Sequence, residues 1–403
     1  QTMTAESVSG LLPYMRIILA LTEQYHALVM NPPYMGGGNM NAVLSNYVKK
    51  NYPEGKADLF SVFMQVCEER LVADGKYGMI NMQSWMFLSS FEKLRTHLLD
   101  TMQIDNMLHL GPRTFDELSG EVVQNTAFVL TKHTPTQTGT YYRLVEGKSC
   151  GDKERMFLAG EHCYSHVSQQ NFEKIPGCPI GYWVSEKMIE AFDNLKCLEE
   201  DFEFKKGMST GDNTRFIRNW FEVSNNNVFY DCLSKEEAIN SEKKWYPINS
   251  GGCYRKWYGN QDCVVNWLHD GEEMKANAIL LNHGGHWSRY ITSTDKFFRS
   301  GLSWNAISSG NICVRYFDQG FLFCSASMCG YGKDIEGAIA LINSNVGMEI
   351  LKLLSPTMNY GPLQVKKIPF AKCIGVKSLV VQNISISRAD WDAHETSWDF
   401  QEN

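Results

Sequence analysis

A tetrapeptide near the start of the chain combines the groups needed to hold a flat base with an exocyclic amine. Asn31-Pro32-Pro33-Tyr34 directly follows a short apolar run and is followed by the glycine run 36–38. The prolines stiffen the turn, because each ring fixes its own φ angle. The Asn31 side-chain oxygen and the Pro32 carbonyl can each accept one amine hydrogen, which makes the nitrogen lone pair more available, and the Tyr34 ring offers a stacking face. The pattern predicts a catalytic role for Asn31, Pro32, Pro33 and Tyr34.

Strands and helices alternate around this tetrapeptide. Apolar runs predict strands at 27–30, 77–82, 104–110 and 122–132, and apolar residues at helical spacing predict helices at 14–25, 57–73 and 90–100. This alternation is typical of a mostly parallel sheet with helices on both faces. Ligands of such sheets bind at the carboxyl ends of the strands, where the tetrapeptide is expected to lie.

The pattern changes after about residue 135. The chain becomes rich in aromatic residues and glycine, and a single long helix is expected again only at 334–354. We therefore expect three regions, 1–135, a connecting region 136–180, and 181–403. The aromatic residues of the last region are expected to form mostly core.

Composition excludes several classes of protein. The 403 residues are 43% hydrophobic and 21% charged, as in ordinary globular proteins, and they contain no apolar run of membrane-spanning length. A net charge of −7 does not suit a generally basic nucleic-acid coat, so any DNA-binding field must be local. The 12 scattered cysteines suit reduced thiols in the cytoplasm, and their spacing fits no zinc pattern, so no metal is expected.

The motifs also carry a resemblance. Asn-Pro-Pro-Tyr is the catalytic motif of the S-adenosylmethionine-dependent amino methyltransferases, which include DNA adenine-N6 methyltransferases. Together with the stretches 52–65 and 75–99, it resembles the methyltransferases of the BREX phage-defence systems, which are similar to fused restriction–modification methyltransferases. The stretches 205–223 and 341–370 resemble the target-recognition region of the same group.

This resemblance implies an α/β fold in which the C-terminal half of a Rossmann-like class I methyltransferase sheet is followed by a mixed α/β target-recognition domain. It implies a cytoplasmic, site-specific adenine-N6 methyltransferase that flips its target base out of double-stranded DNA. Other phage-defence proteins are further candidate partners, and a membrane is not. Asp58 and Phe60 fall on the helix behind the expected pocket, where ordinary helix packing is the favoured interpretation.

Related enzymes bind S-adenosylmethionine through a Phe-x-Gly-x-Gly loop and an acidic residue that precede the Asn-Pro-Pro-Tyr motif. The motif begins here at residue 31, which leaves no room for them, and the glycine run 36–38 follows the wrong strand. We therefore expect the chain to be the C-terminal portion of a longer protein, with no cofactor-binding residues of its own and no efficient methylation when alone.

Cations, hydroxyls and amides around a glycine suit contacts with phosphates and base edges. The loop around Gly211 has this composition, and the stretch 251–260, which pairs Arg255 and Lys256 with aromatic residues, could be a groove-facing loop. The DNA-binding candidates that follow from the loops and the resemblance are Lys205, Lys206, Ser209, Thr210, Asn213, Arg215, Arg218, Tyr254, Arg255 and Lys256.

Other functions remain open from the residues alone. The chain could be a DNA-recognition or interaction module without catalysis, which S-adenosylmethionine binding by the full-length protein would distinguish. Asn-Pro-Pro-Tyr also occurs in enzymes that methylate glutamine in protein release factors, but those lack a large aromatic C-terminal domain. Glu203-x-Lys205 echoes a metal-dependent nuclease motif but has no acidic partner strand.

Overall fold

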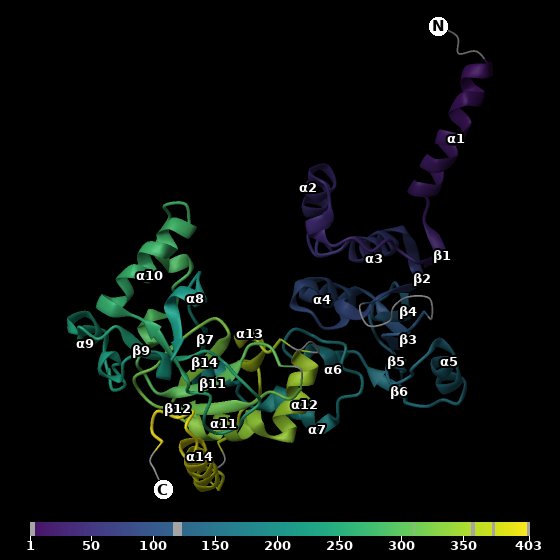
Figure 1. The fold of residues 1–403 in the computed structure, drawn as a ribbon. Helices are drawn as coiled ribbons and strands as arrows, with labels where there is room; N and C mark the ends of the chain where they lie inside the picture. Colours follow the sequence, from purple (N-terminus) through teal and green to yellow (C-terminus); the bar gives the residue numbers. More distant parts are fainter. Residues whose placement is uncertain (1–4, 116–122, 309, 356–358, 373–374, 401–403) are drawn as a thin grey trace. The chain divides into compact units, whose positions relative to one another are not determined.

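The computed structural model describes residues 5–115, 123–308, 310–355, 359–372 and 375–400, with side chains from residue 10. The chain divides into two compact units, 1–189 and 190–403. Each is a mixed α/β body (Figure 1).

The first unit is built around one six-stranded sheet. Its strands are β1 (Tyr25–Met30), β2 (Leu71–Met82), β3 (Gln103–Gly111), β4 (Asn125–Thr131), β5 (Thr138–Arg143) and β6 (Cys163–Ser168). Its helices are α1 (Ala5–Thr22), α2 (Ala42–Asn51), α3 (Leu59–Arg70), α4 (Glu92–Thr101), α5 (Cys150–Leu158) and α6 (Gln170–Glu173), and α7 (Glu186–Asn194) spans the division between the units. The expected strand start at Val122 lies outside the described residues.

The sheet is mixed, so the expectation of a mostly parallel sheet is wrong. The strand order is β1-β2-β4-β3-β5-β6, in which only β1–β2 and β3–β5 pair in parallel. β4 pairs antiparallel with both β2 and β3, and β6 pairs antiparallel with β5. Apolar patterning identifies a strand but not its direction, because side chains alternate in the same way in parallel and antiparallel strands. The stretch 138–168, within the expected connecting region, adds β5 and β6 to this sheet.

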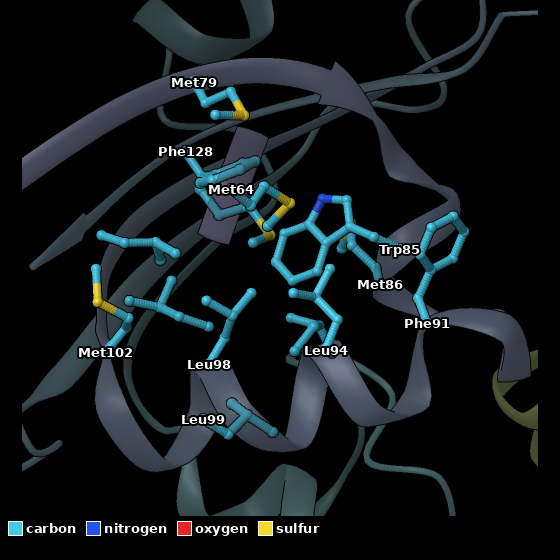
Figure 2. Packing of buried hydrophobic residues seen from close by; sticks show 14 of the residues in the cluster. Met64, Met79, Trp85, Met86, Phe91, Leu94, Leu98, Leu99, Met102 and Phe128 are labelled. Carbon is cyan, nitrogen blue, oxygen red and sulfur yellow. The ribbon is translucent and has the colours of Figure 1, made fainter. Parts of the chain in front are cut away.

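Helices α3 and α4 form as amphipathic helices whose apolar sides enter the core of the first unit. Phe60, Met64 and Cys67 of α3 are buried at helical spacing, and so are Leu94 and Leu98 of α4. They pack with residues from β2, β4 and the turn after β2, including Met79, Phe128, Trp85 and Met86 (Figure 2). This core holds α3 in place, and α3 begins next to the tetrapeptide.

The second unit contains two four-stranded sheets, ordered β13-β9-β10-β8 and β12-β11-β14-β7. The strands are β7 (Phe202–Lys206), β8 (Ile217–Asn219), β9 (Trp245–Asn249), β10 (Cys263–Asn266), β11 (Gly301–Asn305), β12 (Val314–Phe317), β13 (Leu322–Phe323) and β14 (Ser327–Gly332). The helices are α8 (Asn213–Phe216), α9 (Lys235–Asn240), α10 (Leu268–Leu281), α11 (Ile335–Asn343), α12 (Asn345–Leu354), α13 (Pro362–Val365) and α14 (Lys377–Asp392). Trp267 and Trp304 are fully buried in its interior.

The single helix expected at 334–354 is two helices, α11 and α12, which bend by 76°. Ser344 starts the second helix, because its side chain accepts a hydrogen bond from the Gly347 backbone. A Cβ at Gly347 would lie 2.1 Å from the Leu341 carbonyl oxygen, so the break needs glycine. None of the described helices could cross a bilayer by itself, although this bent pair has the length and composition when its halves are counted together.

Buried cysteines of the described chain, such as Cys67 and Cys329, are free thiols, and Cys373 lies outside the described residues. Burial raises the pKa of the Cys67 thiol to about 11. The Cys67 side chain therefore stays protonated near neutral pH and packs as an apolar group.

Candidate active site

The tetrapeptide lies at one edge of the six-stranded sheet. β1 and β2 run in parallel, with Met30 opposite Met79, so their carboxyl ends meet at this edge. β4 runs the other way, and its first residue, Asn125, pairs with Met82 at the end of β2. The sheet topology therefore brings the start of β4 to the side of the turn that follows β1.

Within the tetrapeptide, Pro32 is buried while Asn31, Pro33 and Tyr34 are exposed. A buried, rigid proline fixes the backbone, and the neighbouring Asn31 side chain is left open to a ligand. The arrangement thus presents an amide oxygen and an aromatic ring on a turn of restricted freedom.

Two side chains hold Tyr34. Its ring meets the buried Phe60 edge-on, with ring centroids 6.1 Å apart and an interplanar angle of 84°. Its hydroxyl oxygen accepts a hydrogen bond of 3.2 Å from Nδ2 of Asn125. Partial burial raises the pKa of Tyr34, so the phenol stays protonated at neutral pH. Since 39% of the residue is exposed, part of the ring remains accessible for stacking.

Asp58 ties the tetrapeptide to α3. Its carboxylate caps the helix by accepting from the Phe60 backbone, and it also accepts a 2.9 Å hydrogen bond from the Met35 backbone N–H. The Leu59 backbone N–H donates in return to the Met35 carbonyl. Asp58 and Phe60 thus have the packing roles that the sequence favoured, and both act directly on the turn that carries Tyr34.

The glycine run has a structural use. A Cβ at Gly37 would lie 2.9 Å from the Lys56 carbonyl oxygen, whereas a Cβ at Gly38 would meet nothing within 4 Å. The Gly37 backbone N–H donates to the Ala57 carbonyl. Close packing of this loop on residues 56–58 therefore explains the glycine at position 37.

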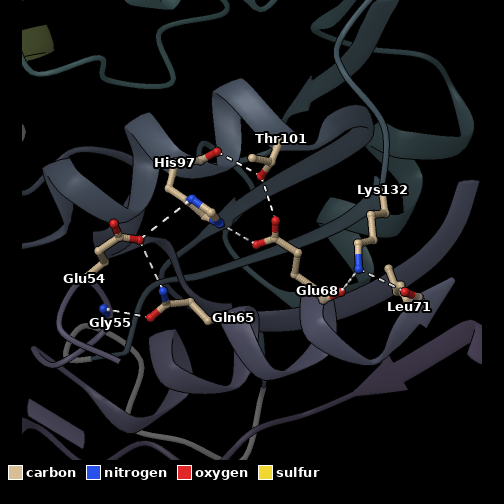
Figure 3. Close-up of polar contacts among 8 residues, drawn as sticks. All are labelled: Glu54, Gly55, Gln65, Glu68, Leu71, His97, Thr101 and Lys132. Carbon is tan, nitrogen blue, oxygen red and sulfur yellow. Dashed lines mark hydrogen bonds and ion pairs between the residues drawn. The ribbon is translucent and has the colours of Figure 1, made fainter. Parts of the chain in front are cut away.

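A network of polar side chains links α3 to α4 (Figure 3). Nε2 of His97 lies 2.8 Å from Glu68, its Nδ1 lies 3.9 Å from Glu54, and the Thr101 hydroxyl donates to Glu68. The hydrogen bond to Glu68 raises the pKa of His97 against the effect of burial. Burial favours protonation of Glu68, but hydrogen bonds from His97 and Thr101 hold its pKa below the usual value. The network clamps the helix that supports Tyr34.

This clamp predicts a pH-dependent contribution to stability. The raised pKa of His97 gives stabilisation that is complete below its unfolded value of 6.5 and lost as the pH rises through the folded value. The lowered pKa of Glu68 gives stabilisation that is complete above its unfolded value of 4.5 and lost as the pH falls through the folded value. His97→Gln should therefore destabilise the protein most between pH 4.5 and pH 6.5, where both contributions are complete. The loss should be less than about 1 kcal/mol, because the His97–Glu68 pair is partly exposed.

Urea unfolding of the protein and its His97→Gln variant at several pH values checks this prediction. His26→Gln, which changes an exposed histidine on β1, is the matched control. A destabilisation of the same size at about pH 6 and about pH 9 would contradict the charge-based explanation.

A second group of polar side chains lies at the same edge of the sheet, and the sequence did not predict it. Gln83 donates to Gln124 and lies 2.8 Å from Nε2 of His109, whose Nδ1 lies 3.0 Å from the Tyr182 hydroxyl. Burial, with Arg143 and Lys153 nearby, lowers the pKa of His109 to about 3, so the ring is neutral. These contacts join residues far apart in the sequence, and only the sheet order brings them together.

Five of the DNA-binding candidates lie between 205 and 213. Lys206 and Asn213 are exposed, Lys205 and Ser209 are partly exposed, and Thr210 is buried. The Lys205 ammonium lies 3.5 Å from Glu203, and the Thr210 hydroxyl donates to the Asn213 side chain. Thr210 therefore supports the loop from inside, while Lys206 and Asn213 are open to a partner.

Arg215 and Arg218 follow in α8 and β8. The Arg215 guanidinium donates twice to Glu273 of α10 and lies over the Phe216 ring. Arg218 donates to the carbonyls of Thr214 and Ile217. Arg215 is half-exposed, so its guanidinium can still reach a ligand.

Arg255 and Lys256 have intramolecular partners, which favour a structural role for both. Arg255 donates to Asp390 and lies over the Trp391 ring, so it anchors the end of α14. The Lys256 ammonium donates to the Asn343 carbonyl at the end of α11. Tyr254 beside them is 60% exposed and remains open to a partner.

In the part of the chain that the structure describes, no three histidine, cysteine, aspartate or glutamate side chains gather as metal ligands would. Glu203, of the nuclease-like pair, forms ion pairs with Lys205 and Lys296 at 3.5 and 2.9 Å. Those contacts occupy its carboxylate within the protein.

Comparison with known sequences gives two kinds of similarity. Residues 11–115 match the Eco57I restriction-modification methylase family. The chain is 40% identical over 402 residues to the adenine-specific methyltransferase PglX of Lacticaseibacillus casei (strain Zhang), covering 96% of this chain and 33% of the relative. It is 37% identical over 405 residues to the adenine-specific methyltransferase BrxX of Escherichia coli O9:H4 (strain HS), covering 99% and 32%. The chain spans about a third of the length of these relatives.

Solved structures share the fold at low sequence identity. The type IIL restriction-modification enzyme MmeI, determined in complex with DNA, has a TM-score of 0.58 at 12% identity, over 93% of this chain and 50% of its own. The type ISP restriction-modification enzyme LlaGI, in complex with a DNA substrate mimic, has a TM-score of 0.52 at 11% identity, over 98% and 37%. The fold similarity to restriction-modification enzymes therefore covers both units of this chain.

Proposed function

We propose that this chain is part of a site-specific DNA adenine-N6 methyltransferase of a phage-defence or restriction–modification system. The chain matches about one third of the length of the adenine-specific methyltransferases PglX and BrxX. The observation that carries the proposal is Tyr34, whose partly exposed ring is held at the sheet edge by Phe60 and Asn125, beside the open side chain of Asn31. Such an enzyme would work in the cytoplasm, where its DNA is.

In this proposal the tetrapeptide binds an adenine that has left the duplex, because a stacked base cannot reach a methyl donor. Tyr34 stacks on the base. The Asn31 side chain and the Pro32 carbonyl each accept one hydrogen of the N6 amine, which orients the nitrogen lone pair away from the base plane. No general base is needed before attack, because the neutral amine attacks through its own lone pair as the methyl–sulfur bond breaks, and the methylated nitrogen loses its extra proton to solvent afterwards. Positioning and exclusion of water would supply most of the rate.

S-adenosylmethionine would supply an electrophilic methyl group. The turn that follows β1 offers no glycine loop of the Phe-x-Gly-x-Gly type, so we assign donor binding to a part of the full-length protein outside these residues. That assignment is supported by the relatives, which are about three times as long as this chain.

We further propose that residues 1–135 are the C-terminal part of a Rossmann-like class I catalytic domain. The parallel pair β1–β2, with α3 between the two strands in sequence, supports this assignment. Residues 136–180 would connect it to a target-recognition domain at 181–403, although β5 and β6 make them part of the same sheet.

The recognition domain would contact double-stranded DNA through its exposed polar loop. We propose Lys205, Lys206, Ser209, Asn213, Arg215, Arg218 and Tyr254 as contacts, with Thr210, Arg255 and Lys256 supporting the loops from within. Restriction-modification enzymes of similar fold have been solved with DNA, which supports this partner. Other phage-defence proteins remain candidate partners.

Tyr34→Ala tests the proposal in the full-length protein. Loss of base stacking, worth about 1–3 kcal/mol, should slow methylation by roughly 5- to 150-fold. The measurement is N6-methyladenine sequencing of DNA from a host without its own adenine methylation that expresses the full-length gene with its neighbouring defence genes. Tyr47→Ala, at an exposed tyrosine of α2, is the matched control.

Methylation at one asymmetric DNA motif that falls in Tyr34→Ala and persists in Tyr47→Ala would support the enzyme. Soluble full-length protein that binds DNA but leaves no N6-methyladenine would refute it and favour a recognition module without catalysis. If Tyr34→Ala methylates DNA as well as the wild-type protein does, Tyr34 does not bind the target base.

A further inference from the structure

Asn125 is an unusual residue for its place in the fold. It stands at the start of β4 with only 1% of its surface exposed, beside the turn that carries the tetrapeptide. Burial of an amide in a sheet core is costly unless all its polar atoms are bonded. Asn125 thus invites a functional explanation.

The nitrogen and the oxygen of the Asn125 amide differ in their hydrogen bonds. Its Nδ2 donates both to the Tyr34 hydroxyl, at 3.2 Å, and to the Asn81 carbonyl, at 3.3 Å. Its Oδ1 is buried and finds no donor among the described residues. A buried acceptor without a partner lowers stability, so this amide is poorly explained by folding alone.

The second bond fixes the direction of the amide. A flipped side chain would point Oδ1 at the Asn81 carbonyl, and two acceptors repel each other. Asn81 is itself held, because its side-chain oxygen accepts from the Trp85 indole at 3.0 Å within the core. Asn125 therefore presents an N–H of set direction to Tyr34.

We propose that Asn125 is a positioning residue that holds the Tyr34 ring in the orientation needed to stack on the target base. Phe60 restrains one edge of the ring, and Asn125 restrains the hydroxyl at its far end. Two restraints at separate points stop the ring from swinging about its χ1 and χ2 angles. The proposal rests on the proposed base-binding function of the tetrapeptide.

A double-mutant cycle in the full-length protein tests the role. Asn125→Leu removes the donor and the unpaired acceptor, and Tyr34→Phe removes the hydroxyl but keeps the ring. Each should lower kcat for methylation about three- to tenfold, with little change in KM for DNA, because phosphate contacts dominate DNA affinity. In the Tyr34→Phe background, Asn125→Leu should have less than about a twofold further effect, since both changes break the same bond.

A second readout does not depend on activity. A fluorotyrosine placed at position 34 of the full-length protein reports the phenol pKa by fluorine NMR. The bond from Asn125 lowers the pKa of Tyr34, so Asn125→Leu should raise the fluorotyrosine pKa. A site that merely loosened would expose the phenol, and its pKa would then fall, because burial is what raises it.

If Asn125→Leu lowers kcat by the same factor with tyrosine and with phenylalanine at position 34, the proposal is overturned. A fall in the fluorotyrosine pKa in Asn125→Leu would also overturn it. A lower melting temperature that tracks the loss of kcat would assign Asn125 to folding instead. If the full-length protein methylates no DNA, the proposed function fails. The fluorine measurement still decides whether Asn125 holds Tyr34.

Discussion

Asn31→Ala in the full-length protein is expected to reduce the rate of adenine-N6 methylation by about 10²–10³-fold, the loss seen when one preorganised polar group facing the reacting atom is removed. Asn31 is the side chain that accepts a hydrogen of the attacking amine in the proposed site. Its position after β1 is set by the buried Pro32 that follows it, so no neighbour can replace its oxygen without moving the backbone. Single-turnover methylation of DNA that carries the recognised motif measures the effect.

Two controls make this result specific. Asn31→Asp keeps an acceptor oxygen at the same position and should retain more activity than Asn31→Ala. Asn31 is exposed, so neither change should lower the melting temperature by more than a surface substitution does. Equal activity of wild-type protein and Asn31→Ala would refute the assignment of the amine to this side chain.

The sequence predicted the tetrapeptide's position well because strand endings are local. An apolar run followed by two prolines must stop a strand, and β1 does end at Met30. Helices α3 and α4 were also predictable, since their buried residues recur at helical spacing. These features depend on a few consecutive residues.

Other features could not be predicted because they depend on pairing between distant segments. The partnership of Asn125 with Tyr34 spans 91 positions and exists only because β4 runs antiparallel beside β2. The partners of Arg255 and Lys256 lie on α14 and α11, so two cations that suggested phosphate contacts are held within the protein. A cation shows its charge in the sequence but not the direction of its side chain.

Arg95→Ala is expected to destabilise the first unit by about 3–5 kcal/mol, because several carbonyls lose their donor at a cost of about 1–3 kcal/mol each. Arg95 is 1% exposed, and its guanidinium donates to the carbonyls of Trp85, Leu88, Gly177 and Cys178. Burial lowers its pKa to about 10, so it stays charged near neutral pH.

The size of this effect follows from what the four carbonyls lose. They come from the turn after β2 and from residues 177–178. A methyl group at position 95 would take the side-chain donor away from the carbonyls of Trp85, Gly177 and Cys178, whereas the Leu88 carbonyl would keep its bond from the Phe91 backbone N–H. Arg95→Lys keeps the charge but replaces the planar five-donor group with three donors at one point, so it should fall between wild type and Arg95→Ala. Urea unfolding at neutral pH measures both, with Lys93→Ala on the exposed side of α4 as the control. If Arg95→Ala unfolds at the same urea concentration as Lys93→Ala, the guanidinium does not join these segments. The turn after β2, which leads from the strand beside the tetrapeptide, must then be held by its other contacts, such as the apolar packing of Trp85 and Met86 and the Trp85–Asn81 hydrogen bond.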